Sequence, residues 1–224
     1  MPSLGSIVID VSGFYTYFSN KIVPDYDSDP QEIIYRNLAG YGVSRGVSAN
    51  LDLSFRNGLK ALLGATLMDV YNIQKAADGT PETRAQLFAP RWQATWAISY
   101  SLRKPGLTFD LTGKVYGPQR LPVVPDDYRP EYSPVFALAN FQLTKKFTPE
   151  IEVYASAKNL FNFFPRDPIL HADDPYNQPG GKYFDETGAP RHDTNPRHYT
   201  FDPSYNYAPL QGIKGLIGVR YAMW

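Results

Sequence analysis

The side chains best suited to catalysis or metal binding lie together in one polar segment, residues 162–208. This segment is rich in Pro, Asp, Asn, Tyr and Gly. Imidazole and carboxylate groups bind metal ions, so one hypothesis is a metal or ferric-ligand site. The groups of this kind are His171, Asp173, Asp174, Asp185, Glu186, His192, Asp193 and His198. Their spacings match no metal-site signature, and Asp is frequent in loops because its side chain stabilises turns. We therefore interpret the segment as a solvated loop and expect neither a metal site nor a cofactor.

The same segment is a candidate for ligand capture, because tyrosine offers a large contact area at a small loss of conformational entropy. The candidate contact residues are Tyr176, Tyr183, Tyr199, Tyr205 and Tyr207. This hypothesis predicts that the segment contributes to the affinity for a small-molecule ligand.

Catalysis has little support in the sequence. There is no nucleophile elbow, no Walker loop and no HExxH motif. The alternative is a hydrolase with His171 and Asp173 at the rim of a membrane barrel, as some outer-membrane proteases and lipases have. We expect that the protein is not an enzyme.

The composition favours an all-β protein with no nucleic-acid partner. Lys and Arg balance Asp and Glu at 22 each, so net charge indicates no nucleic-acid groove. Seventeen Tyr and 13 Phe beside only three Met are typical of pleated sheets rather than helices. The absence of Cys excludes disulfides and thiolate metal sites. No apolar run approaches the roughly 18 residues that a membrane-spanning helix needs.

Alternation with a period of two is the main structural signal. In residues 41–55 the odd positions are apolar except Arg45, and the even positions are small or polar. Residues 92–102 and 107–116 alternate in the same way, and residues 7–23, 59–71, 135–143, 151–161 and 213–223 do so more weakly. Such alternation is typical of strands with one apolar face, so the sequence predicts about eight antiparallel strands.

The connections between these strands alternate in length. Short connections lie at residues 56–58, 103–106 and 146–148, and long ones at 24–31, 72–89, 118–132 and 162–208. Outer-membrane barrels show this asymmetry, with tight periplasmic turns and long extracellular loops.

The turns also predict strand register, because a shift of one residue moves every side chain to the other face. A three-residue turn at 56–58, with Gly58 in a left-handed bulge, keeps the apolar faces together; the alternative two-residue turn brings Phe55 opposite Lys60. The predicted pairs are Phe55 with Leu59, Leu51 with Leu63, Val47 with Leu67, Arg45 with Asp69, Leu102 with Leu107, and Trp96 with Gly113.

The nature of the polar face favours a membrane barrel. A soluble sheet usually presents Lys and Glu to water, whereas this face is mostly Ser, Gly, Thr, Asn, Gln and Ala. We interpret the apolar face as facing lipid, with Trp92, Trp96 and Tyr100 as candidates for an interfacial girdle. The alternative is a soluble β-sandwich that buries Trp96, Leu51 and Leu111 in a dry centre.

The small polar side chains also predict a wide lumen. A closed eight-stranded barrel must fill its narrow interior, and this face fills little. The chain therefore fits an arc of a wider barrel, and a small stand-alone barrel is a second alternative.

Three segments resemble the C-terminal half of TonB-dependent receptors. Residues 12–22 resemble a strand with an aromatic pair followed by Asn and Ile. Asn37 and Gly40, followed by Gly46 and Val47, resemble a second strand, with Ser48 in place of the usual Glu. The most specific match is the penultimate-strand signature, which contains Asn159, Leu160 and Phe161.

The chain terminus resembles the family's closing strand, which normally ends in an aromatic residue that the barrel-assembly machinery reads. Here Trp224 follows Tyr221 by three positions instead of the usual two, which indicates an added residue or a bulge.

The resemblance implies a role in active transport across the outer membrane. It implies that residues 1–224 are the C-terminal part of the barrel, and that a plug domain, a TonB box and a signal peptide lie upstream of this fragment. The implied ligand is a siderophore, cobalamin or glycan, with residues 162–208 as an extracellular loop. The implied partners are the lipid bilayer and lipopolysaccharide of the outer membrane, the TonB complex and the barrel-assembly machinery.

Overall fold

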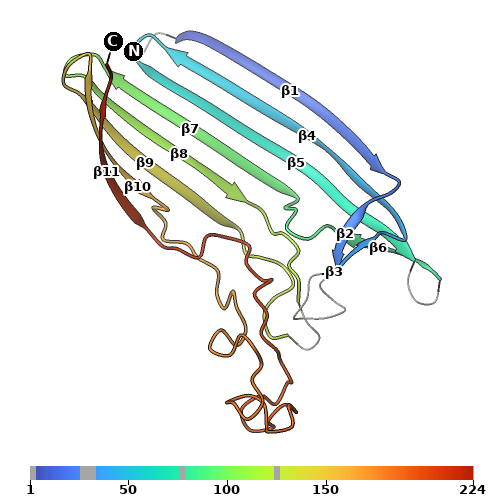
Figure 1. Ribbon diagram of the computed structural model, residues 1–224. Helices are drawn as coiled ribbons and strands as arrows, with labels where there is room; N and C mark the ends of the chain where they lie inside the picture. Colours follow the sequence, from blue (N-terminus) through green and yellow to red (C-terminus); the bar gives the residue numbers. More distant parts are fainter. Residues whose placement is uncertain (1–3, 26–33, 76–78, 124–126, 224) are drawn as a thin grey trace.

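The computed structural model describes residues 4–25, 34–75, 79–123 and 127–223, and the regular structure in these ranges is all β (Figure 1). Among these residues there is no helix of the length and apolarity needed to cross a membrane. The strands are β1 (Leu4–Phe18), β2 (Ile22–Asp25), β3 (Ile34–Asn37), β4 (Gly40–Phe55), β5 (Leu59–Lys75), β6 (Pro81–Ala85), β7 (Trp92–Leu102), β8 (Leu107–Tyr116), β9 (Phe136–Lys146), β10 (Ile151–Lys158) and β11 (Lys214–Tyr221).

Eight of these strands form an antiparallel meander in the order β1-β4-β5-β7-β8-β9-β10-β11. This arrangement confirms the predicted fold class. Within the described residues β1 and β11 are the two edges of the sheet and do not pair with each other, so the sheet is an open arc. The alternative of a small stand-alone barrel requires that pairing, and the alternative of a β-sandwich requires a second large sheet; neither alternative fits this topology.

Three strands were missed by the sequence-based prediction. The predicted strand at 7–23 is wrong as a single element, because the chain bends after Phe18 and β2 pairs with β3 as a separate hairpin. The long connections predicted at 24–31 and 72–89 are also partly wrong. The first overlaps the end of β2, while the second contains the last residues of β5 and the whole of β6, which pairs with β5 from Tyr71 to Lys75.

The predicted registers are confirmed where the pairing is described. Leu51 pairs with Leu63, Val47 with Leu67, and Arg45 with Asp69. Gly58 adopts the left-handed conformation at φ 90°, and its N–H donates to the Phe55 carbonyl over 3.2 Å. On the next hairpin Leu102 pairs with Leu107 and Trp96 with Gly113. The Trp96 ring covers Gly113 so closely that a Cβ there would lie 2.1 Å from Cζ2.

These registers join the apolar side chains into one continuous face across the sheet. One row runs from Ile9 through Leu51 and Leu63 to Trp96. This face remains accessible: in the row Ile9 is 69% and Leu63 37% exposed, and on the same face of β11 Ile217 is 78% exposed. Trp96, Leu51 and Leu111 are only partly buried, so they do not form the dry centre of a sandwich. A face this apolar is stable when lipid covers it.

Most of the fully buried apolar side chains lie outside the sheet, beyond the loop ends of the strands. They include Leu121, Leu170, Phe184 and Tyr205, which come from the two long connections after β8 and β10. Figure 1 shows these connections extending away from the sheet as one body. The loops therefore have a small core of their own.

The turn at Gly58 gives a test of the register. Gly58 and Gly79 both have positive φ, of 90° and 83°, so Ala at either position incurs the cost of a left-handed residue, about 1–2 kcal/mol. Only at Gly58 would the new Cβ also meet backbone, 2.3 Å from the Ser101 carbonyl oxygen of β7. We expect Gly58→Ala to reduce the unfolding free energy of the receptor in detergent by at least ~1 kcal/mol more than Gly79→Ala. Equal losses in urea titrations of the two variants would show that the close approach of β7 is not as described.

Candidate functional site

The long segment 162–208 is anchored at its base by two asparagines that follow β10. Asn159, at φ 52°, donates from Nδ2 to the carbonyls of Phe163 and Gln211, over 2.8 and 3.1 Å. Asn162 accepts the N–H of Ile213 at 2.9 Å. The first and last residues of the segment are thus held together, directly beneath β11. This contact gives a physical role to Asn159 in the penultimate-strand signature.

A buried ion cluster joins this segment to the connection between β8 and β9. Arg129 donates to Asp127 over 2.7 Å and to Asp202 over 2.5 Å. The three side chains are 1%, 1% and 3% exposed. Burial by itself would lower the pKa of Arg129, but the hydrogen bonds to both carboxylates outweigh it and raise the pKa above its ordinary value. Charges this deeply buried hold the two connections in one arrangement.

Tyr205 completes this cluster. Its ring lies 4.3 Å from the Arg129 guanidinium carbon, and its hydroxyl donates to the Pro130 carbonyl over 2.6 Å. Burial raises the pKa of Tyr205 to about 12. The side chain is 2% exposed, so it presents no surface to a ligand.

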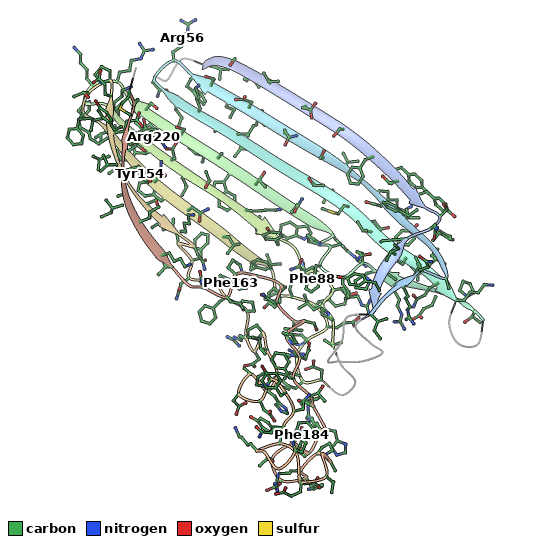
Figure 2. All side chains as sticks on the ribbon, viewed as in Figure 1. Arg56, Phe88, Tyr154, Phe163, Phe184 and Arg220 are labelled. Atoms are coloured by element: carbon green, nitrogen blue, oxygen red, sulfur yellow. The ribbon has the colours of Figure 1, made fainter. Side chains whose placement is uncertain are left out.

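The five predicted contact tyrosines therefore separate into two groups. Tyr199 is buried, and the Asn195 side chain donates to its backbone carbonyl and accepts its backbone N–H. The ring centroids of Tyr207 and Phe136 lie 5.7 Å apart. Together with Tyr205 these residues build the loop core. Tyr176 is 89% exposed, and Tyr183 lies at the surface near the tip marked by Phe184 in Figure 2. These last two remain candidate contact residues.

The His and carboxylate groups of the segment serve mainly as turn and surface partners. Asp185 accepts hydrogen bonds from Thr187 and Ala189, and Asp174 accepts the N–H of Gln178. His171 stacks on Tyr183 with ring centroids 3.8 Å apart, and Tyr183 donates to Asp173 over 2.8 Å. In the part of the chain that the structure describes, no group of three or more such side chains is arranged to hold a metal ion.

A polar cavity of about 280 Å³ lies at the base of the loops, where sequence analysis predicted no site. It is formed by β2 and β3, the far ends of β5 and β6, and the connection after β8. The charged residues in the described part of its lining are all cations, and amide side chains supply most of the other polar groups. The polar lining consists of Arg36, Lys75, Arg84, Arg120, Asn37, Asn72, Gln74 and Gln86.

The described carboxylates near this cavity pair with its arginines and do not line it. Glu82 pairs with Arg84 at 2.9 Å and Glu131 with Arg120 at 3.0 Å, and neither Glu lines the cavity. The exposed Lys75 ammonium has no described partner. Beside the wall, Lys21 donates to Asn72 and Gln86 over 3.0 and 2.8 Å. Burial lowers the pKa of Lys21. The arrangement therefore favours an anionic or oxygen-rich ligand.

Sequence reasoning missed this cavity because its residues come from five separate segments with no shared spacing. Of the family-signature residues, Asn37 lines the cavity. Gly46 lies where a Cβ would be 2.4 Å from the Leu67 carbonyl oxygen and 2.7 Å from the Phe14 ring. Leu160 donates its N–H to Ala139 over 2.8 Å, and Phe161 is exposed. Trp224 lies outside the described residues.

Comparison with known proteins supports the same class of protein as this geometry. A family described as TonB dependent receptor-like, beta-barrel matches residues 3–160. A search of the curated proteins returns no match.

Among solved structures, the ferric-catecholate import receptor Fiu from E. coli K12 is similar with a TM-score of 0.58 and 11% identity, over 96% of this chain and 25% of that one. The FrpB iron transporter from Neisseria meningitidis has a TM-score of 0.56 and 14% identity, over 97% and 28%. The ferripyoverdine receptor from Pseudomonas aeruginosa, bound to ferripyoverdine, has a TM-score of 0.50 and 15% identity, over 70% and 21%. The chain thus spans about a quarter of the first two receptors.

The fold is that of an outer-membrane barrel wall, and the family match extends over more than half of the chain. The chain belongs to the TonB-dependent receptor β-barrel family. Members of this family are outer-membrane transporters and not enzymes.

The ion cluster predicts how the loops respond to mutation. Arg129→Met leaves Asp127 and Asp202 buried without a partner, which typically costs about 3–5 kcal/mol. We expect chymotrypsin to cleave segment 162–208 at least tenfold faster in this variant on intact cells. Arg166→Met, at an exposed position with no described hydrogen bond or ion pair, is the matched control. Resistance equal to that of the control would show that the cluster does not hold the loops together.

Because His171 titrates, we expect the stability of the loop tip to depend on pH. Burial lowers its pKa below the ordinary 6.5, although Asp173 and Asp174 oppose this shift and Lys182 adds to it. The open loop therefore takes up a proton first, so the stability that neutral His171 contributes is full above about pH 6.5 and is lost as the pH falls through the lowered pKa.

We expect amide hydrogen exchange of residues 171–183 to be faster, relative to the intrinsic rate, at pH 5 than at pH 7.5. The variant His171→Asn tolerates the left-handed backbone at φ 46° and does not titrate, so its relative exchange should be the same at both pH values. Equal pH dependence in both proteins would contradict this assignment.

Proposed function

We propose that this chain forms part of the wall and the extracellular loops of a receptor that takes up a scarce small-molecule nutrient across the outer membrane, with energy supplied through TonB. Residues 1–224 are the C-terminal part of the barrel, and a plug domain and further strands complete it. The open sheet and the coverage of about a quarter of the solved receptors support this arrangement.

The single observation that carries the ligand class is the cationic cavity at the loop base. Among the residues that the structure describes, its lining combines Lys75 and three arginines with amide groups and contains no carboxylate. Such a site binds ligands with negatively charged oxygens more tightly than neutral ones. Of the three ligand classes that the family resemblance implies, a siderophore complex with acidic oxygens fits this cavity better than cobalamin or a neutral glycan. The solved receptors named for ferric catecholates and ferripyoverdine support the same class.

The loop segment 162–208 has a supporting role in this proposal. It has a buried core of its own, Tyr176 is 89% exposed, and Tyr183 is partly exposed beside His171. These two side chains are proposed as first contacts for the ligand, before it reaches the cavity at the base.

The proposed partners follow from the two faces and the two ends of the sheet. The apolar face contacts the bilayer and, in the outer leaflet, lipopolysaccharide. The polar face surrounds the plug through which the TonB complex acts. The barrel-assembly machinery recognises the closing strand β11.

Uptake of a radiolabelled ferric siderophore by cells that express the receptor tests the proposal. Lys75→Glu places a negative charge in the cavity and should raise the apparent Kd for an anionic ferric siderophore about tenfold, which corresponds to ~1.4 kcal/mol. Lys214→Glu, an exposed charge reversal on the polar face of β11 with no described partner, is the control.

Two further results decide the transport function. Uptake should stop in cells that lack TonB, and a neutral ligand should be insensitive to Lys75→Glu. Undiminished uptake without TonB would overturn the proposed transport mechanism, whereas equal affinity of the wild-type and Lys75→Glu receptors would overturn the ligand class alone.

A further inference from the structure

The end of the sheet that carries the short turns is strongly basic. The turns after β4, β7 and β9 lie at this end together with both chain termini (Figure 1). Lys and Arg side chains in or beside these turns are Arg56, Lys60, Arg103, Lys104, Lys145 and Lys146, and Arg220 of β11 lies at the same end. Figure 2 shows Arg56 pointing away from the strands there. The only carboxylates of residues 145–152, which comprise the turn after β9 and the strand ends beside it, are Glu150 and Glu152.

The loop end has the opposite balance. Residues 162–212 contain seven Asp and Glu against four Lys and Arg. The chain has a formal net charge of zero, so its charges are sorted between its two ends rather than absent. A soluble surface that needs charge only for solubility mixes the two signs.

Most of the basic side chains at the turn end have no carboxylate partner. Arg220 pairs with Glu152 at 3.0 Å. By contrast, Arg56, Lys60, Arg103, Lys104 and Lys146 are exposed, and the described part of the chain supplies no ion pair for them. Mutual repulsion of unpaired cations favours an anionic partner.

The position of these cations relative to the apolar face identifies the partner. Phe55, Tyr100 and Phe109 lie on the apolar face close to the turns, where aromatic residues mark the boundary between hydrocarbon and headgroups. The turns lie just beyond that boundary. Lys145 starts on the apolar face, and its ammonium group reaches the Pro105 carbonyl in the neighbouring turn and lies 5.6 Å from the Phe147 ring. A lysine that leaves the apolar face in this way is placed at the level of lipid phosphates.

We infer that this basic collar, defined as Arg56, Arg103, Lys104 and Lys145, binds anionic phospholipid headgroups in the leaflet on the turn side of the membrane; Lys60 and Lys146 pair in register with Ser54 and Glu152 on the polar face and are not part of it. The collar continues directly from the lipid-covered face, so headgroups reach it without any rearrangement of the protein. Cations near an anionic membrane surface attract its lipids, and this attraction weakens as salt screens it. The collar enriches phosphatidylglycerol-type lipids around the barrel and fixes the depth of the turns in the membrane.

Lipid selectivity of the intact receptor in nanodiscs tests this inference. The nanodiscs contain a zwitterionic phosphatidylcholine with a small fraction of fluorescent phosphatidylglycerol, and energy transfer from the receptor tryptophans measures enrichment of the anionic lipid. The test variant Arg56→Gln, Arg103→Gln, Lys104→Gln removes three charges that lie in turns and in no strand. The control Arg91→Gln, Arg166→Gln, Lys182→Gln removes three exposed charges near the loop end.

We expect the wild-type receptor and the control to favour phosphatidylglycerol over labelled phosphatidylcholine, and the test variant to lose this preference by roughly tenfold at low salt. Raising the salt to about 1 M should abolish the preference in the wild-type receptor. No preference in the wild-type receptor, or an equal loss in both variants, would overturn the inference. Binding of an acidic protein to the collar, without lipid enrichment, would also overturn it. None of these outcomes depends on the transported ligand.

Discussion

An apolar sheet face without protein cover is the constraint on which the rest of this structure depends. Lipid supplies the cover, but lipid offers no hydrogen bonds, so each backbone group must be paired within the sheet. The alternation of faces then leaves no tolerance for register errors, since one slip would place Asp52 or Ser54 against hydrocarbon. Left-handed glycines in the tight turns, at Gly58 and Gly106, set the registers that keep Ile9, Leu51 and Trp96 on one side.

At the loop end the connections are surrounded by water instead of lipid. They are too long to be held by the strand ends alone, so they have a core of their own. The buried group of Arg129, Asp127 and Asp202 holds two connections that are distant in the sequence, and Tyr205 packs against the guanidinium. The chain thus contains two separate apolar systems, one covered by lipid and one closed within the loops. A preorganised loop body loses less conformational entropy when a ligand binds.

The sheet could be predicted from the sequence because lipid contact imposes a strict period of two, and because the turn lengths then determine which residues face each other. Arg45 and Asp69 were predicted to meet for this reason, and they form an ion pair at 2.9 Å. In contrast, β6 was not predicted. It lies beyond the level at which β7 pairs with β5, and its sequence of Glu82, Thr83 and Arg84 has no apolar alternation. The roles of the tyrosines were equally inaccessible, because burial of Tyr205 depends on Pro130, 75 positions away.

The placement of charge explains how a chain with no net charge can still select its partners. Electrostatic attraction acts locally, because salt screens interactions beyond roughly 10 Å. The cavity cations Lys75 and Arg120 therefore act on a ligand at the loop base independently of the acidic segment above them and of the basic collar at the opposite end of the strands. An anion that reaches the loop base meets ammonium, guanidinium and amide donors, and the described lining residues include no carboxylate. Net charge, the quantity read first from a sequence, is thus uninformative about this protein, whereas the cationic lining at the loop base and the basic collar at the turn end each predict a separate anionic partner.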